Sequence, residues 1–219
     1  MKQLFRYLQY FAGLIILALG ITLNTKTGLG VSPIISVPYC ISQIWHINFG
    51  YATLALYCLF IAAQFLIKGK NKRAADLLQL PLSIVFSLFL NLLNDILAFS
   101  SRVIWINLLI LLIAIICTGV GVSLSVNSNL VVNPGDGIVQ AIAMRTGSQL
   151  GFTKNLFDLS CIIITLIIGF AFAGKMIGIG IGTVAAVIGV GRVVALTNYM
   201  MKKKYDETGI ITGELVKEE

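Results

Sequence analysis

Residues 29–35 read LGVSPII, and residues 130–136 read LVVNPGD, which is the same pattern 101 positions later. The match extends on both sides without a gap, and its paired residues include Gly20 with Gly121, Pro33 with Pro134, and Gly50 with Gly151. Aliphatic matches are common in a hydrophobic sequence, whereas a proline and two glycines in register are not. The chain is therefore predicted to contain two related halves, which in membrane proteins often meet around a shared interface.

The composition indicates that a lipid bilayer surrounds the chain. Of its 219 residues 58% are hydrophobic and only 11% are charged, whereas a soluble domain carries about 25% charged residues. A helix needs roughly 20 apolar residues to cross about 30 Å of hydrocarbon. Six runs meet that requirement: Tyr7–Leu23, Phe49–Ile67, Leu80–Phe99, Val103–Leu124, Phe152–Phe172 and Met176–Thr197. The expected fold is an all-α polytopic membrane protein with about six transmembrane helices.

These spans form one predicted membrane domain over residues 1–201, followed by a polar cytoplasmic tail over residues 202–219. The first repeat is expected at about 7–99 and the second at about 103–199. The net charge of +7 is concentrated beside spans, at Lys68–Arg73 and Lys202–Lys204. Such clusters face the cytoplasm, so both termini are predicted to be cytoplasmic and nucleic-acid binding is not expected.

Two shorter segments, Val31–Trp45 and Val132–Arg145, contain the repeated prolines and allow two topologies. If each segment dips into the membrane and returns, the chain has six spans, three in each half. If each segment crosses, the chain has eight spans and the Lys68–Arg73 cluster lies outside. The positive charges favour six spans, and an odd number of helices in each half makes the repeat inverted. A short amphipathic helix at the membrane surface is a third interpretation of each segment.

The dipeptides Ser32-Pro33 and Asn133-Pro134 predict the start of a short helix in each half. Serine and asparagine are good N-caps, and proline is tolerated at the first helical position. A helix start at membrane depth offers free N–H groups and the positive end of a dipole, so the two starts are candidate substrate or ion sites. Asp136, in the first turn of the second start, is then a candidate cation or proton ligand. The alternative is a capped helix start at the membrane surface.

Other ionisable groups within spans are candidates because burying a charge in lipid is costly. In the six-span arrangement Asp158 and Arg192 share roughly one depth with Asp136, so Arg192 could pair with either aspartate. The alternative is that Arg192 reaches the lipid head groups. Asn91 and Asp95 lie near the outer end of the third span, where Asp95 could simply mark a helix end.

Glycines in the sixth span predict close helix contact. Gly178, Gly182 and Gly189 recur at helical spacing on one face. The four cysteines show no CxxC spacing, and the chain has a single histidine, so no metal site, cofactor or catalytic residue is expected. The chain is not expected to be an enzyme.

Three short motifs resemble the YczE/YyaS/YitT group of bacterial integral membrane proteins over roughly residues 8–200: Leu29-Gly30-Val31-Ser32-Pro33, Phe49-Gly50, and Gly180-Ile181-Gly182-Thr183-Val184. The resemblance implies a multi-pass protein of the bacterial cytoplasmic membrane. The group's pattern continues after the proline with Trp-Asp, where this chain has Ile34 and Ile35. An aspartate two residues after the proline occurs only in the second copy, so any role of that residue transfers to Asp136 alone.

Three functions agree with these features. The leading hypothesis is a small secondary transporter or exporter of an unknown small solute or ion, because inverted repeats and paired helix starts are typical of transporters. The second is a substrate-binding membrane subunit of a larger transporter, and the third is a non-transporting accessory membrane protein. The expected partners are the lipid bilayer, the solute or ion, and either a second copy of the chain or another membrane protein.

Overall fold

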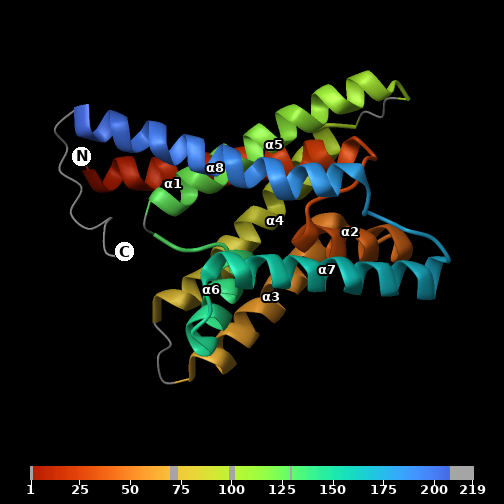
Figure 1. The fold of residues 1–219 in the computed structure, drawn as a ribbon, viewed down its shortest axis with the longest axis horizontal. Coiled ribbons are helices and arrows are strands. Elements are labelled where there is room, and N and C mark those ends of the chain that lie inside the picture. The colour runs from red at the N-terminus through yellow and green to blue at the C-terminus, as the bar shows by residue number, and fades with distance from the viewer. Residues whose placement is uncertain (1, 70–73, 99–101, 129, 208–219) are drawn as a thin grey trace.

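The structure is a computed structural model that describes residues 2–69, 74–98, 102–128 and 130–207. Its helices are α1 (Lys2–Lys26), α2 (Pro33–Trp45), α3 (Phe49–Lys68), the 3-10 helix η2 (Ala74–Leu78), α4 (Gln79–Ile96), α5 (Ile104–Asn127), α6 (Pro134–Thr146), α7 (Leu150–Ala173) and α8 (Ile181–Glu207). No strand occurs in these ranges. Figure 1 shows α1, α7 and α8 running along the long axis of the molecule, with α3, α4 and α5 inclined to it.

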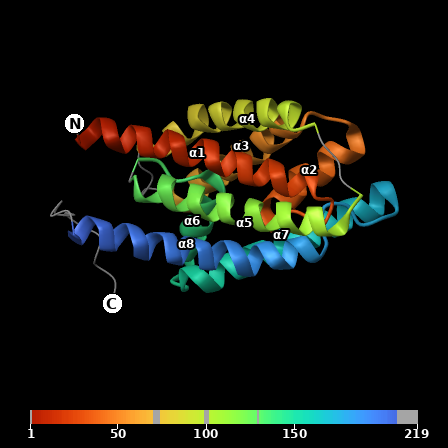
Figure 2. The same cartoon turned by 90° about the horizontal axis from the view of Figure 1, so that it is seen from above.

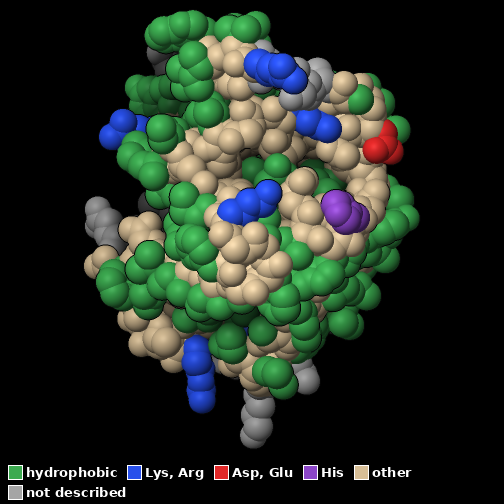
Figure 3. All heavy atoms as spheres, turned by 90° about the vertical axis from the view of Figure 1, so that its right-hand side faces the viewer, with side chains coloured by type: hydrophobic (Ala, Val, Ile, Leu, Met, Phe, Trp, Pro, Cys, Tyr) green, Lys and Arg blue, Asp and Glu red, His purple; other side chains and the backbone are tan. Residues whose placement is uncertain are grey.

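Six helices are long and apolar enough to cross a membrane: α1, α3, α4, α5, α7 and α8. They correspond to the six predicted spans, so the all-α polytopic membrane fold is confirmed. Large apolar side chains point outward along them, such as Leu66 at 83% exposed and Ile181 at 78%. Seen from the right-hand end in Figure 3, hydrophobic side chains form much of the surface, with a few Lys and Arg side chains among them. Such an exterior matches lipid rather than water.

The closest packing joins α1 to α5, through glycines that the repeat places in register. A Cβ atom built on Gly20 would lie 2.5 Å from the backbone nitrogen of Thr118, and one built on Gly121 would lie 2.5 Å from that of Leu17. Leu17 and Thr118 are themselves a matched pair in the repeat. Because residue 17 meets 121 while residue 20 meets 118, the two helices run antiparallel, as Figure 2 shows.

Each short helix packs against a long helix of the other half: α2 against α7, and α6 against α3. The two contacts use matched positions. Gln64 of α3 fills the space beside Gly137 of α6, and Thr165 of α7 shares a 2.7 Å hydrogen bond with Ser36 of α2. The 101-residue shift relates Gln64 to Thr165 and Ser36 to Gly137. The large Gln64 and the small Gly137 thus correspond in the repeat to Thr165 and Ser36, which are closer to each other in size.

The chain ends and connections fall at two ends of the molecule. Figure 1 places the N-terminal end of α1 and the C-terminal ends of α3, α5 and α8 at the left, and the C-terminal ends of α1 and α7 at the right. Each short helix therefore lies between two long-helix ends on the same side of the molecule. This is the arrangement that six spans require. The inverted orientation of the halves in a membrane stays a prediction, supported by the antiparallel α1–α5 contact.

The sixth span begins later in the chain than predicted. Gly178 does not lie in the sixth span, because α8 begins at Ile181, and Gly178 precedes it with a φ of 78° that glycine adopts without strain. The Val31 N–H donates to the Gly178 carbonyl at 2.8 Å, which holds this irregular segment in place. The third span ends at Ile96, and the predicted end at Phe99 lies outside the described residues. So do residues 208–219 of the predicted tail and residues 70–73 of the charged cluster.

The arrangement of helix ends predicts which residues a membrane-impermeant thiol reagent reaches. With the four native cysteines replaced, Lys175→Cys and Arg102→Cys should label from outside the cell. Gln3→Cys and Ser148→Cys should label only after the membrane is opened. All four positions are exposed, so lack of labelling reports the side of the membrane rather than burial. Outside labelling of Ser148→Cys would contradict the six-span topology.

The α1–α5 contact predicts a position-specific loss of stability. In Gly121→Ala the added methyl group meets the backbone of Leu17, which cannot move aside without displacing α1, so the variant should lose about 1–3 kcal/mol. Thermal unfolding in detergent, followed by circular dichroism, measures the change. The matched control is Gly191→Ala, because nothing lies within 4 Å of a Cβ atom there. Equal melting temperatures for the two variants would disprove the contact.

Candidate functional site

The start of α6 is a capped helix N-terminus inside the molecule. Asn133 occupies the cap, and its side-chain Oδ1 accepts a hydrogen bond from the Gly135 N–H at 2.9 Å. Pro134 follows at the first helical position, where no backbone donor is needed. A Cβ atom on Gly135 would lie 3.3 Å from Ile34 near the start of α2. Since Ile34 and Gly135 are a matched pair in the repeat, the two helix starts meet at equivalent residues.

Three charged side chains gather beside the start of α6. Lys154 Nζ lies 3.3 Å from Asp158 Oδ1, one turn along α7, and 3.8 Å from Asp136 Oδ1. The Asp158 side chain is 13% exposed, while those of Asp136 and Lys154 are 32% and 40% exposed. With two carboxylates and one ammonium group, the cluster carries a formal charge of −1. It can therefore accept a further cation or a proton.

A neutral pair of side chains supports the same helix start from the other side. The amides of Gln64 and Gln79 exchange two hydrogen bonds of 3.1 Å, and Gln64 also donates to the Pro134 carbonyl at 3.2 Å. Both side chains are buried, at 1% and 3% exposed. Because buried amides need partners, this pair fixes the position of α6 relative to α3 and α4.

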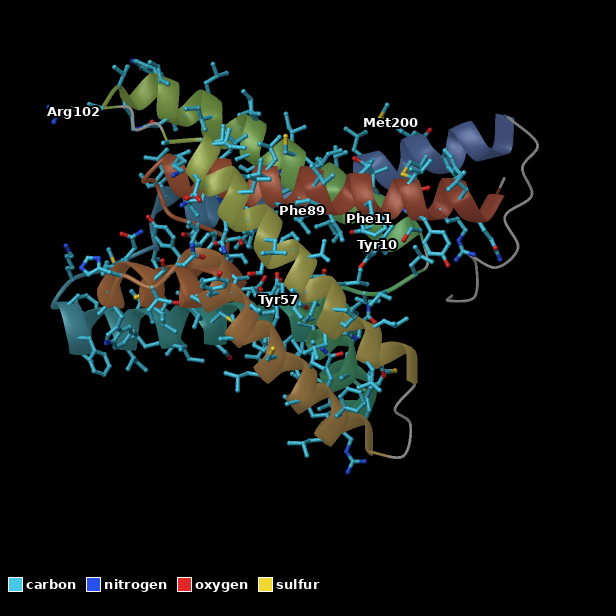
Figure 4. All side chains as sticks on the ribbon, turned by 180° about the vertical axis from the view of Figure 1, so that it is seen from behind. Tyr10, Phe11, Tyr57, Phe89, Arg102 and Met200 are labelled. Carbon is cyan, nitrogen blue, oxygen red and sulfur yellow. The ribbon has the colours of Figure 1, made fainter. Side chains whose placement is uncertain are left out.

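Two small cavities lie at the two helix starts, each with a volume of about 10 Å³, close to the space that holds one water molecule. The α6 cavity is bounded by polar groups of Tyr57, Gln79, Ser83 and Asn133 and by Tyr10. Figure 4 labels Tyr57 near the middle of the molecule, with Tyr10 on α1.

The α2 cavity uses positions that the repeat relates to those of the α6 cavity. Ile115, Val31 and Ser32 line it, where Leu14, Val132 and Asn133 line the other. The two cavities are thus equivalent places in the two halves.

The start of α2 differs from that of α6 in two respects. Ser32 occupies the N-cap position of α2, as predicted, but its side chain makes no cap hydrogen bond. Ser32 and Asn133 have nearly the same backbone angles, so the two starts differ in their side chains rather than in their backbone. Ile35 occupies the position that corresponds to Asp136. The first half therefore lacks both the side-chain cap and the carboxylate.

The remaining predicted site residues lie elsewhere. Asn91 Oδ1 accepts the Gly50 N–H at 2.8 Å, which joins α4 to α3, and Asp95 is exposed near the end of α4. Arg192 is exposed on α8, and the ion pairs of the two aspartates go to Lys154 instead. The preference for Lys154 has a simple cause, because it lies one helical turn from Asp158.

The predicted packing glycines of α8 contact other elements closely. A Cβ atom on Gly182 would lie 2.9 Å from the carbonyls of Leu29 and Gly30, and one on Gly189 would lie 2.8 Å from Ile115 of α5. Within the described ranges, no group of three or more His, Cys, Asp or Glu side chains could hold a metal ion.

Sequence reasoning did not single out Gln64, Gln79 or Tyr57. The available signal was the polar Gln64 within the second apolar run, since an amide inside a span requires a buried partner. Nothing in the sequence pairs it with Gln79, which lies at the start of α4.

Comparison with known proteins agrees with the family resemblance found in the sequence. A protein-family model described as "Family of unknown function (DUF6198)" matches residues 4–199. The "Uncharacterized membrane protein YczE" of Bacillus subtilis (strain 168) is 28% identical over 215 residues, which cover 93% of this chain and 95% of that protein. No solved structure matches.

The glutamine pair predicts a measurable cost on truncation. Gln64→Leu removes the donor to Pro134 and leaves the buried amide of Gln79 unpaired, which should destabilise the protein by about 1–3 kcal/mol. Thermal unfolding in detergent checks this value. Gln149→Leu is the control, because Gln149 is exposed and makes no side-chain cap bond. A Gln64→Leu variant as stable as Gln149→Leu would show that the amide pair contributes nothing.

Proposed function

The chain belongs to the DUF6198 family of unknown function, and from that premise we propose that this integral membrane protein is a small secondary transporter or exporter. Its substrate would be a small solute or ion moved across the bacterial cytoplasmic membrane, with both termini on the cytoplasmic side. The proposal includes no enzymatic role. Its cation or proton ligand is Asp136.

The observation that carries the proposal is the charged cluster at the start of α6. Intramembrane ionisable groups are costly, and in membrane proteins they mark ion pathways. Lys154 lies nearer to Asp158 than to Asp136, so Asp136 is the carboxylate more readily taken by a cation or proton. Asp136 is also the more exposed of the two carboxylates, which gives it access from outside the cluster.

The position of the cluster supports coupling to a conformational change. Asp136 belongs to α6 of the second half, which packs on α3 of the first half, while Lys154 and Asp158 belong to α7, which packs on α2. A cation that binds Asp136 competes with Lys154 for it. Loss of the Asp136–Lys154 contact would loosen α6 from α7 and so change how the second half packs on α3 and α2 of the first half.

The test is flux in reconstituted vesicles. Proteoliposomes with a trapped pH-sensitive dye are exposed to inward gradients of protons, Na⁺ and K⁺, first alone and then with a panel of small solutes. Wild-type protein should change the internal pH faster than empty vesicles under at least one gradient. Asp136→Asn should lower that rate by at least about tenfold, because the amide cannot be charged.

The matched control is Asp95→Asn, which neutralises an exposed aspartate away from the cluster and should keep the wild-type rate. Wild-type vesicles no faster than empty ones under all gradients would reject proton-coupled transport of the tested solutes and ions. Copurification of such an inactive protein with a nucleotide-hydrolysing partner would then identify a substrate-binding subunit, and its absence would favour the accessory role. Normal flux in Asp136→Asn would reject Asp136 as the ligand while keeping transport.

A further inference from the structure

The helices form two groups, each drawn from both halves of the repeat. In the first group α1 packs on α4 and α5, and α5 packs on α8. In the second group α2 and α6 each pack on α3 and α7. In the part of the chain that the structure describes, the only extensive helix contact between the groups is that of α3 with α4, whereas α7 and α8 make little or no contact. Figure 1 shows α1, α5 and α8 above the second group, with α4 running from one group to the other.

The repeat turns this difference into an asymmetry between equivalent helix pairs. The 101-residue shift relates α3 to α7 and α4 to α8, so the packed pair corresponds to the separated pair. Where α3 meets α4, a Cβ atom on Gly50 would lie 2.5 Å from the Ser87 carbonyl oxygen, and Asn91 accepts the Gly50 N–H. At the equivalent Gly151 nothing lies within 4 Å of a Cβ atom. One pair is therefore closed at the position where the other is open.

The separation leaves apolar side chains of α8 exposed. In α4, Phe86 stacks on Tyr57 of α3 with ring centroids 6.0 Å apart, and both Phe86 and Ser87 are only 2% exposed. Their equivalents in α8 are Val187 and Ile188, which are 41% and 50% exposed. Thus α8 carries apolar side chains at the positions through which α4 contacts α3, where they fit a contact with α7.

An arginine on α8 adds charge complementarity to this fit. Arg192 is equivalent to Asn91 and is exposed within the last span, where a charge that faces lipid is costly. The charged cluster at the start of α6 carries a formal charge of −1, and two of its members, Lys154 and Asp158, lie on α7 within about two turns of Gly151. Contact between α7 and α8 would bring the positive Arg192 toward this negative cluster.

We propose that the chain has a second conformation in which α8 closes on α7, so that Ile188 meets Gly151 as Ser87 meets Gly50, and in which the α3–α4 contact opens. In the predicted orientation Gly50 lies near the outer end of the spans and Gly151 near the inner end. The two contacts would therefore open the two sides of the membrane in turn. The purpose of this movement rests on the proposed transport function, whereas the movement itself is tested without flux.

Cross-linking tests the closed α7–α8 pair. In a background without the four native cysteines, Gly151→Cys and Ile188→Cys are combined in proteoliposomes and oxidised with copper phenanthroline. A disulfide requires Cβ atoms about 4 Å apart, so the pair should give at least about tenfold more intramolecular disulfide than Gly151→Cys with Phe11→Cys. Phe11 is the control because it is exposed on α1, which makes no extensive contact with α7. Equal yields, or disulfides that join two chains only, would overturn the proposal.

The α3–α4 contact should open when the α7–α8 pair is locked. Ser87→Cys, at a position 2% exposed beside Gly50, is added to the cross-linkable pair. Once the 151–188 disulfide has formed, a soluble maleimide should label residue 87 at least about tenfold faster than in the reduced protein, because the lock populates the second conformation. Unchanged labelling, measured by mass spectrometry, would overturn the alternation of the two contacts. Neither experiment measures flux, so failure of this movement is distinguished from failure of transport.

Discussion

The antiparallel contact of α1 with α5 is the constraint on which the rest of the structure depends. Its glycines let two backbones approach so closely that an added methyl group would meet a main-chain nitrogen at 2.5 Å. In lipid, helix association lacks the hydrophobic drive available in water and rests on such close packing. Because Gly20 and Gly121 are matched in the repeat, one contact geometry is used twice. The two halves are thereby joined around equivalent residues, and the short helices are brought together at their starts.

The short helices owe their position to this exchange between halves. α2 packs on α7 and α6 packs on α3, so each helix start lies inside the protein rather than in lipid. Irregular backbone at membrane depth is tolerated only in such surroundings. The Gln64–Gln79 pair and the Ser36–Thr165 hydrogen bond then hold the two short helices by different chemistry at matched positions. The two halves therefore share a backbone arrangement, but the side chains that hold α2 differ from those that hold α6.

The difference in charge between the two starts has consequences for what each can bind. The α6 start carries Asp136 close to Lys154 and Asp158, so its positive dipole end is balanced by side chains of the chain itself. The α2 start has Ile35 where the α6 start has Asp136, so no carboxylate lies in its first turn. A few substitutions thus give two equivalent places different charges. The proposed cation ligand at Asp136 is a result of that asymmetry.

The sequence by itself determined the membrane class, the six spans, the two-fold repeat and the helix starts at Pro33 and Pro134. These features depend on hydropathy, on proline chemistry and on register, which are local or periodic properties. Tertiary structure alone decided that Lys154 also meets Asp136, that Gln64 pairs with Gln79, and that Gly178 lies outside α8. Those outcomes depend on which helix faces which, and residues 15 or more positions apart carry no local signal of contact. The N-cap position of Ser32 was likewise predicted from the sequence, whereas the absence of a side-chain cap hydrogen bond there was decided only in the folded protein.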